Sequence, residues 1–238
     1  GYDTMKNFDM NCWICGDKGT PGEHLIKASD IKMLFPDISQ KKPAYKHTSN
    51  RKNIPIGSKK SNRLKSNALI CKKCNNQRTQ AYDSAWESLS CYIYDNWNTI
   101  NQTNRIDLRK AFSGCIEGSA KNFHLYFLKL FGCLLVESKN YKIANEFAIS
   151  IRTKDPHNDV FIFFVKTADF IGQSCVGISD LDVIYFDGSN LIRASWVYMI
   201  GELSLRIVYL HPDHSHLEPI RGWNPKYLSD VINITNIG

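Results

Sequence analysis

The chain has 238 residues, 43% hydrophobic and 22% charged, which excludes a disordered or fibrous protein and allows one large domain or two small ones. Its net charge is +7, but the segment between Asp37 and Asp83 contains 12 lysines and arginines and no acidic residue, so the rest has a net charge of −5. Such a basic segment indicates a phosphate-bearing partner such as DNA, although a solvated basic loop has the same composition.

Two Cys-x-x-Cys pairs lie in the first third of the chain, at Cys12 and Cys15 and at Cys71 and Cys74. Four thiolates at this spacing are typical of a tetrahedral zinc site with a structural role. The other cysteines are scattered among mostly apolar residues, where a free thiol behaves as a small hydrophobic side chain. Zinc rather than disulfides is therefore expected, in a reducing cytoplasm and without a signal peptide.

Four helices are predicted after the second cysteine pair, at residues 83–94, 105–116, 122–137 and 140–150, because apolar residues recur there at helical spacing. A segment rich in Asn and Thr, residues 96–104, is a candidate linker or loop. The most apolar run, residues 125–136, is interrupted by Lys129 and is too short to cross a bilayer, so no membrane partner is expected.

The pattern changes to strands after Pro156. Runs rich in β-branched and aromatic residues occupy residues 159–166, 182–186, 191–199 and 203–210. A cluster of histidines at residues 211–216 follows, and we interpret it as a surface loop without chemistry.

We predict an α+β protein of two domains. A small zinc-stapled domain occupies residues 5–95, and an accessory domain at residues 105–238 consists of a helical segment followed by an antiparallel β-sheet. The first domain has no long apolar period of its own before residue 81, so it needs the metal in order to fold.

Further polar residues around the cysteine pairs form an ordered set. Glu23-His24 follows the first pair, Asn67 precedes the second pair, and Asn75-Asn76 follows it. This set, over about residues 11 to 86, resembles the zinc-knuckle branch of the HNH endonucleases, in particular a bacterial subgroup. The resemblance implies a ββα-metal fold, in which a hairpin and a helix hold one divalent metal between them.

The resemblance also implies a role for each of these residues. His24 would be the general base that takes a proton from the water attacking a DNA phosphodiester, because the pKa of an imidazole lies near neutrality. Asn67 would hold the connecting loop and orient His24. Glu23 and Asn75, or the adjacent Asn76, would bind a catalytic Mg²⁺ or Mn²⁺ through oxygen atoms.

Three points of spacing stay open. The middle asparagine of the family lies five residues before the cysteine, where this chain has Ser66, so the register of the hairpin and the role of Asn67 are open. Spacing alone does not distinguish Asn75 from Asn76. Neighbouring residues point to opposite faces of a regular strand, so a metal shared by Glu23 and His24 requires a bend beside them.

Three functions compete on this pattern. The main hypothesis is a metal-dependent DNA endonuclease acting in restriction or anti-phage defence. The second is a zinc-knuckle module that binds nucleic acid without cutting it. The third is a sensor, in which the second half of the chain controls the nuclease as a homodimer or with a partner protein of a defence system. The basic residues expected to contact DNA are Lys59, Lys60, Arg63, Lys72, Lys73 and Arg78.

Overall fold

Helix α6 (Ile116–Glu137) is the centre of the structure, a computed structural model that describes residues 11–37, 40, 44–46, 54–56, 64–167, 175–218, 222–227 and 229–237. The other helices and helical turns are α2 (Ala28–Leu34), η2 (Lys73–Arg78), α3 (Gln80–Asp95), α4 (Trp97–Thr103), α5 (Leu108–Ala111), α7 (Tyr141–Thr153), η4 (Pro212–Leu217) and η5 (Pro225–Tyr227). The strands are β1 (Thr20–Pro21), β2 (Ala44–Lys46), β3 (Ile54–Ile56), β4 (Leu69–Ile70), β5 (Arg105–Asp107), β6 (Val160–Thr167), β7 (Val176–Ile178), β8 (Asp182–Phe186), β9 (Asn190–Ile200), β10 (Leu203–Leu210) and β11 (Val231–Ile237). The predicted α+β class is confirmed.

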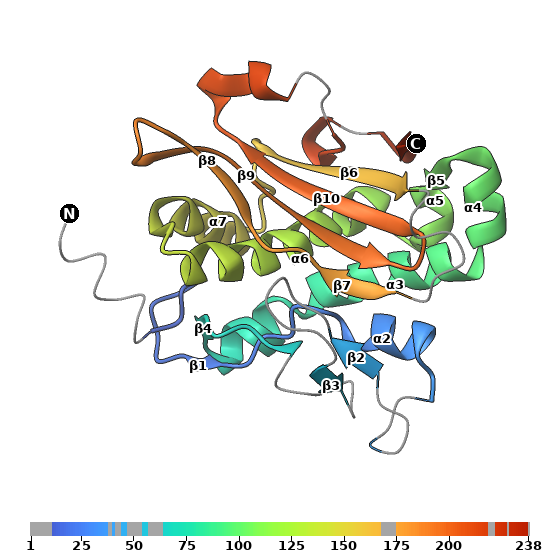
Figure 1. Ribbon diagram of the computed structural model, residues 1–238, viewed down its shortest axis with the longest axis horizontal. Coiled ribbons are helices and arrows are strands. Elements are labelled where there is room, and N and C mark those ends of the chain that lie inside the picture. Colours follow the sequence, from blue (N-terminus) through green and yellow to red (C-terminus); the bar gives the residue numbers. More distant parts are fainter. Residues whose placement is uncertain are drawn as a thin grey trace.

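A seven-stranded sheet lies beside α6, with the strand order β5-β11-β6-β10-β9-β7 and β8 paired to β9 (Figure 1). The predicted strands β6, β8, β9 and β10 form antiparallel pairs. The predicted antiparallel pairing holds for most of the sheet, but the sheet is mixed because β11 runs parallel to β6. Strand β11 follows the C-terminal helical turns in the chain and lies between β5 and β6.

Two segments differ from the predicted pattern. Most of the candidate linker at residues 96–104 forms helix α4, which is followed by Asn104 in a left-handed conformation. The helix predicted at residues 105–116 is instead strand β5 followed by the short helix α5. The apolar spacing of this segment comes from two different elements. Ile106 of β5 pairs with Ile232, Leu108 is the first residue of α5, and both Ile106 and Leu108 are buried.

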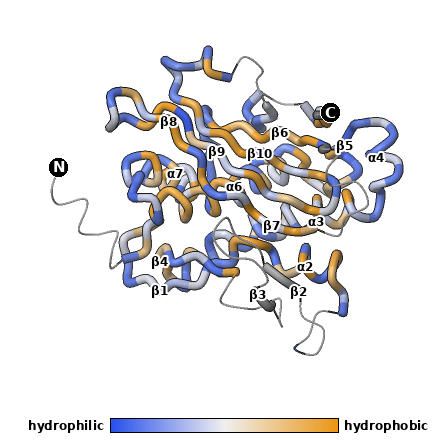
Figure 2. Tube along the Cα trace, viewed as in Figure 1, coloured by the Kyte–Doolittle hydropathy of each residue, from blue (hydrophilic) through white to orange (hydrophobic). Residues whose placement is uncertain are grey.

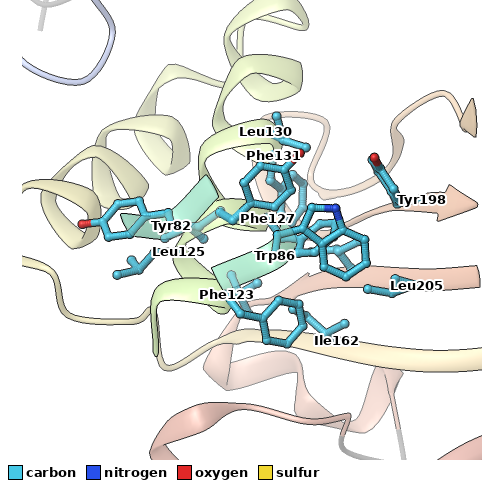
Figure 3. Close-up of a cluster of buried hydrophobic side chains, with 14 of the residues drawn as sticks. Tyr82, Trp86, Phe123, Leu125, Phe127, Leu130, Phe131, Ile162, Tyr198 and Leu205 are labelled. Carbon is cyan, nitrogen blue, oxygen red and sulfur yellow. The ribbon is translucent and has the colours of Figure 1, made fainter. Parts of the chain in front are cut away.

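Aromatic side chains fill the space between α3, α6 and the sheet (Figure 3). The ring of Trp86 in α3 lies edge-on to Phe127 of α6 at 4.8 Å and to Tyr198 of β9 at 5.7 Å. Figure 2 shows that hydrophobic residues are concentrated along α6 and the central strands of the sheet. Such close packing of large rings makes this layer the main apolar core.

The core also includes residues of the cysteine-bearing region. Trp13 is 3% exposed and packs on Gly132 of α6, where an added Cβ would lie only 2.0 Å from the Trp13 ring. Buried side chains are therefore continuous across the predicted domain boundary, and the division into two domains stays a prediction. Within the described residues, no helix has the length and apolar character needed to cross a membrane.

Candidate functional site

The four cysteines predicted to bind zinc lie together although the two pairs are far apart in the sequence. All four Sγ atoms are within 4.8 Å of one another, and those of Cys15 and Cys71 are 3.6 Å apart. Tetrahedral zinc with bonds of ~2.3 Å requires sulfur atoms ~3.8 Å apart. The donor set and spacing therefore fit a metal ion such as zinc, and all eight cysteines of the chain are free thiols.

Local backbone turns present the thiols. Gly16, with φ +83°, closes the turn after Cys15, and its amide donates to the Cys12 carbonyl at 2.8 Å. The Cys74 amide donates to the sulfur of Cys71 at 3.4 Å, so the second turn holds its two cysteines together. Hydrogen bonding with Cys74 lowers the pKa of Cys12 to about 5, and burial raises the pKa of Cys15 to about 11. A bound cation would stabilise the thiolate form of every member of the cluster.

A short antiparallel strand pair connects the two cysteine turns. Thr20 and Pro21 pair with Ile70 and Leu69, and His24 forms an isolated bridge with Lys65. Between these pairings, the first strand has two residues and the second strand has three, namely Ser66, Asn67 and Ala68. The extra residue is a bulge. Gly22 adopts φ +142°, so the first strand also bends directly before Glu23.

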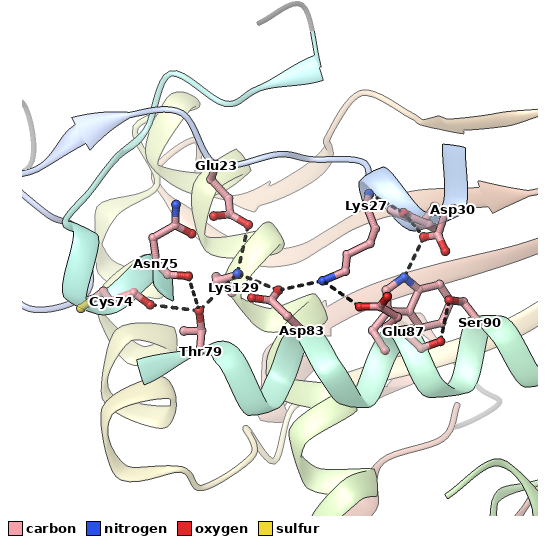
Figure 4. Close-up of polar contacts among 12 residues, drawn as sticks. Glu23, Lys27, Asp30, Cys74, Asn75, Thr79, Asp83, Glu87, Ser90 and Lys129 are labelled. Carbon is pink, nitrogen blue, oxygen red and sulfur yellow. Dashed lines mark hydrogen bonds and ion pairs between the residues drawn. The ribbon is translucent and has the colours of Figure 1, made fainter. Parts of the chain in front are cut away.

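The carboxylate of Glu23 is buried in a charge cluster with α3 and α6 (Figure 4). Its Oε1 is 3.0 Å from Nζ of Lys129, which also contacts Asp83 Oδ1 at 3.1 Å and Thr79 Oγ1 at 3.3 Å. Burial acts to lower the pKa of Lys129, but the charges of Glu23 and Asp83 outweigh it and raise this pKa. A metal at Glu23 would have to share the carboxylate with this ammonium group, and the predicted ligand role of Glu23 stays a prediction.

The bulge separates the two candidates for the middle position of the motif. Asn67 has an exposed side chain, and its backbone amide donates to Glu137 at 2.7 Å. Ser66 is 2% exposed, its hydroxyl also donates to Glu137, and its amide donates to the Glu23 carbonyl at 2.7 Å. Ser66 therefore contacts the strand that carries His24, a contact that the structure does not give to the Asn67 side chain. His24 itself is half-buried.

The segment after the second cysteine pair begins with the π-helical turn η2. Asn75 is half-buried and its amide donates to the Cys71 carbonyl at 2.9 Å, whereas Asn76 is exposed. The Thr79 hydroxyl accepts from Lys129 and points between the carbonyls of Cys74 at 2.9 Å and Asn75 at 3.1 Å, to which it donates. A chain of polar contacts through Lys129 and Thr79 thus joins the carboxylate of Glu23 to the backbone of Asn75, and both Glu23 and Asn75 are predicted site residues.

The predicted DNA-contacting residues are only partly described. Lys59, Lys60 and Arg63 lie outside the described residues. Lys72 and Lys73 are exposed beside the cysteine cluster, and Arg78 is half-buried. These last three side chains leave a basic surface next to Asn75.

The sequence interpretation did not assign a role to Lys129, Asp83 or Thr79. One signal was present, because Lys129 interrupts the most apolar run of the chain. A buried lysine is costly unless it is paired, so it predicts an acidic partner without identifying it. The histidine cluster at residues 211–216, interpreted as a surface loop, lies largely in the 3₁₀ helix η4 (Pro212–Leu217). Comparison with family models, with curated proteins and with solved structures finds no match to this chain.

Proposed function

We propose that the zinc-stapled domain predicted at residues 5–95 is an HNH-type nuclease unit that hydrolyses DNA phosphodiester bonds. The observation that carries this proposal is the cysteine cluster, which joins motif halves 56 residues apart at Cys15 and Cys71. The strand pair next to Glu23 and His24 then precedes, in the same unit, the helical segment bearing Asn75. This order of strand, strand and helix supports a ββα-metal fold.

Zinc in the cluster has a structural role in this proposal. Four cysteine sulfurs complete a tetrahedral site, so no position is left for a water or a substrate. When bound, the zinc supplies a cross-link between the two cysteine turns, in a region whose strands are only two residues long. The chemistry therefore belongs to the polar residues that this cross-link holds together.

His24 is the proposed general base. A neutral imidazole accepts a proton from the attacking water near pH 7, and the bridge with Lys65 holds its backbone on the strand pair. The Asn75 amide oxygen, with Glu23, would hold a Mg²⁺ or Mn²⁺ ion. Such an ion supplies positive charge to the phosphate and the leaving oxygen. Lys72 and Lys73 contact the DNA backbone without reading its sequence.

The test is a cleavage assay with plasmid, linear and single-stranded DNA in Mg²⁺, Mn²⁺ or EDTA. We expect wild-type cleavage only with a divalent metal, and a loss of at least about 100-fold in His24→Ala, which is the ordinary contribution of a general base. His216→Ala, at an exposed histidine, is the matched control and should cleave as the wild type does. Wild-type activity in His24→Ala would remove this residue from the mechanism.

A second pair of variants separates the two adjacent asparagines. Asn75 is half-buried beside the Glu23 cluster, and Asn76 is exposed. We expect Asn75→Ala to abolish metal-dependent cleavage and Asn76→Ala to retain it. The reverse result would assign the metal to Asn76.

The second candidate function is a module that binds DNA without cutting it. The Glu23–Lys129 ion pair favours this alternative, because it neutralises the one acidic side chain of the predicted metal site. A protein that shifts DNA on a gel but cleaves it in no divalent metal would support the binding module. In either case, Lys72→Ala should reduce the dependence of log affinity on log salt by about 0.9 for a lost phosphate contact.

A further inference from the structure

A pocket separate from the Glu23 cluster lies between α2, α3, α4 and the turn from β9 to β10, with a volume of about 290 Å³. Its walls are mainly apolar and include Met33, Ile93, Trp97 and Ile200. Pockets for small organic ligands combine such walls with a few polar groups that orient the ligand. The volume is near the lower end of the ~300–1,000 Å³ found for such sites, which restricts the ligand to a small molecule.

Asp30 of α2 contributes an unusual polar group to this pocket, because its carboxylate is completely buried. Its Oδ2 accepts hydrogen bonds from Trp86 Nε1 at 2.8 Å and from the Tyr198 hydroxyl at 2.6 Å. The Ser90 hydroxyl lies on the same wall, near enough to Asp30 to lower its pKa, but it donates to the Glu87 carbonyl at 3.2 Å. Oδ1 is left without a hydrogen-bond partner among the described residues. An unpartnered buried carboxylate oxygen costs stability and indicates a missing donor.

The charges around the pocket have one sign. Its charged lining residues are Asp30 and Glu202, and the described residues that line it include no lysine, arginine or histidine. Lys27, whose charge acts on Asp30, pairs instead with Asp83 at 3.9 Å and Glu87 at 3.8 Å. Burial raises the pKa of Asp30, as expected for a carboxylate that lacks a close cation. In a chain of net charge +7, this is a locally acidic site.

We propose that the pocket binds a small organic cation, an ammonium group on an apolar body, with the ammonium at Asp30 and the body against Ile93 and Trp97. A cation supplies both the hydrogen-bond donor that Oδ1 lacks and the counter-charge that a buried carboxylate needs. Trp97 also lines the pocket, and an indole is the aromatic ring that attracts a cation most strongly. Its Nε1 donates to Glu202 at 3.1 Å, which holds that carboxylate beside the pocket. This proposal is independent of the nuclease proposal and is tested without DNA.

The experiment is titration calorimetry of the full chain with three probes of matched shape: 2-phenylethylammonium, 2-phenylethanol and phenylacetate. We expect the ammonium to bind about tenfold or more tightly than the alcohol, as hydrogen bonds to charged groups do, and phenylacetate to bind most weakly. Equal affinities for ammonium and alcohol, or no heat from any probe at millimolar concentration, would overturn the proposal.

Three variants test whether the probes bind in this pocket. Asp30→Asn should lower the affinity for the ammonium about tenfold and leave the affinity for the alcohol within about threefold. Because Asp30 also anchors Trp86 and Tyr198, a second variant that spares these contacts is needed. Glu202→Gln, at the turn between β9 and β10, should lower the affinity for the ammonium probe and leave the other two affinities unchanged. Ile93→Trp should prevent binding of all three probes, because the larger side chain fills the pocket.

The matched control is Glu87→Gln, a half-exposed carboxylate on α3 that is not part of the pocket lining. It should bind the three probes as the wild type does. Binding that survives in folded Asp30→Asn, Glu202→Gln and Ile93→Trp would show that the probes bind elsewhere, and would refute the site.

Discussion

Two regions of the molecule are stabilised in different ways. The cysteine-clamped region (residues 11–37 and 64–79) has strands of two residues and depends on four thiols, a few polar contacts and apolar side chains such as Trp13 that join the core beside α6. The helix–sheet region (residues 80–237) has long strands and a continuous aromatic core around α6. Loss of one contact should therefore be severe in the first region and tolerable in the second.

The two regions meet on α6 through very different contacts. Trp13 packs on Gly132, and Glu23 pairs with Lys129 one turn earlier on the same helix. The helix thus serves as the base on which the clamped region and its candidate catalytic residues rest. Three experiments test whether the clamped region depends on a small number of interactions, and a fourth tests the helix–sheet region.

The largest effect is expected for Cys71→Ser. Removal of one ligand should reduce bound zinc from about one ion per chain to almost none, and apparent zinc-binding free energies of ~10–16 kcal/mol exceed what this small region can replace. Metal analysis measures the zinc, and amide hydrogen exchange should show residues 11–37 unprotected while β6, β9 and β10 stay protected. Cys91→Ser, at a half-buried cysteine outside the cluster, should keep the zinc. Unchanged zinc content in Cys71→Ser would contradict the assigned ligands.

The next effect is expected for Lys129→Met. The substitution leaves the buried carboxylate of Glu23 without its cation, and breaking one side of a buried ion pair costs about 3–5 kcal/mol. Guanidinium unfolding measures this loss. Lys121→Met, which removes an exposed ion pair with Glu117 on the same helix, should change stability negligibly. The double variant Lys129→Met with Glu23→Gln should recover part of the stability, and no recovery would show that Lys129 acts through another contact.

A smaller effect is expected for Gly132→Ala. The new methyl group would overlap the Trp13 ring, since an added Cβ lies 2.0 Å from it, and overpacking of this kind costs roughly 2–3 kcal/mol. The loss should be accompanied by greater exposure of Trp13, seen in its fluorescence. Gly118→Ala on the same helix meets only the exposed Cys115 at 3.3 Å and should be tolerated. Equal stability of the two variants would mean that the clamped region does not rest on α6 at Trp13.

The smallest effect concerns the helix–sheet region and its response to pH. Burial lowers the pKa of His124 from 6.5 to about 4, and its Nε2 bonds the Val160 carbonyl at 3.0 Å. His124 of the unfolded chain takes up a proton below about pH 6.5, whereas in the folded chain it does so only near pH 4. The free energy of unfolding therefore decreases as the pH falls from 6.5 towards 4. Between pH 7 and pH 5 the loss should be about 2 kcal/mol.

The His124 contribution is measured as the difference between the wild type and His124→Phe, because the other titrating groups then cancel. A difference that does not change between pH 7 and pH 5 would show that His124 is protonated equally in the folded and unfolded chains.

Much of the helix–sheet region was predictable because periodicity is a local property. The predicted strands 159–166, 191–199 and 203–210 correspond closely to β6, β9 and β10, and the predicted helix 122–137 lies within α6. The prediction failed at residues 105–116, where Ile106 and Leu108 belong to different elements but have a spacing that imitates a helix. Apolar spacing over so short a segment does not distinguish a helix from a strand followed by a turn.

The sequence by itself determined the cysteine pairs, whose ligand spacing needs only a few neighbouring residues, and the α+β class. The tertiary structure alone decided that Glu23 is paired with Lys129, that Ser66 rather than Asn67 contacts the His24 strand, and that Asp30 lines a pocket whose described lining residues include no basic side chain. The physical reason is the same for all three. Each depends on which distant side chain reaches a buried polar group, and packing between α6, α3 and the strands makes that choice.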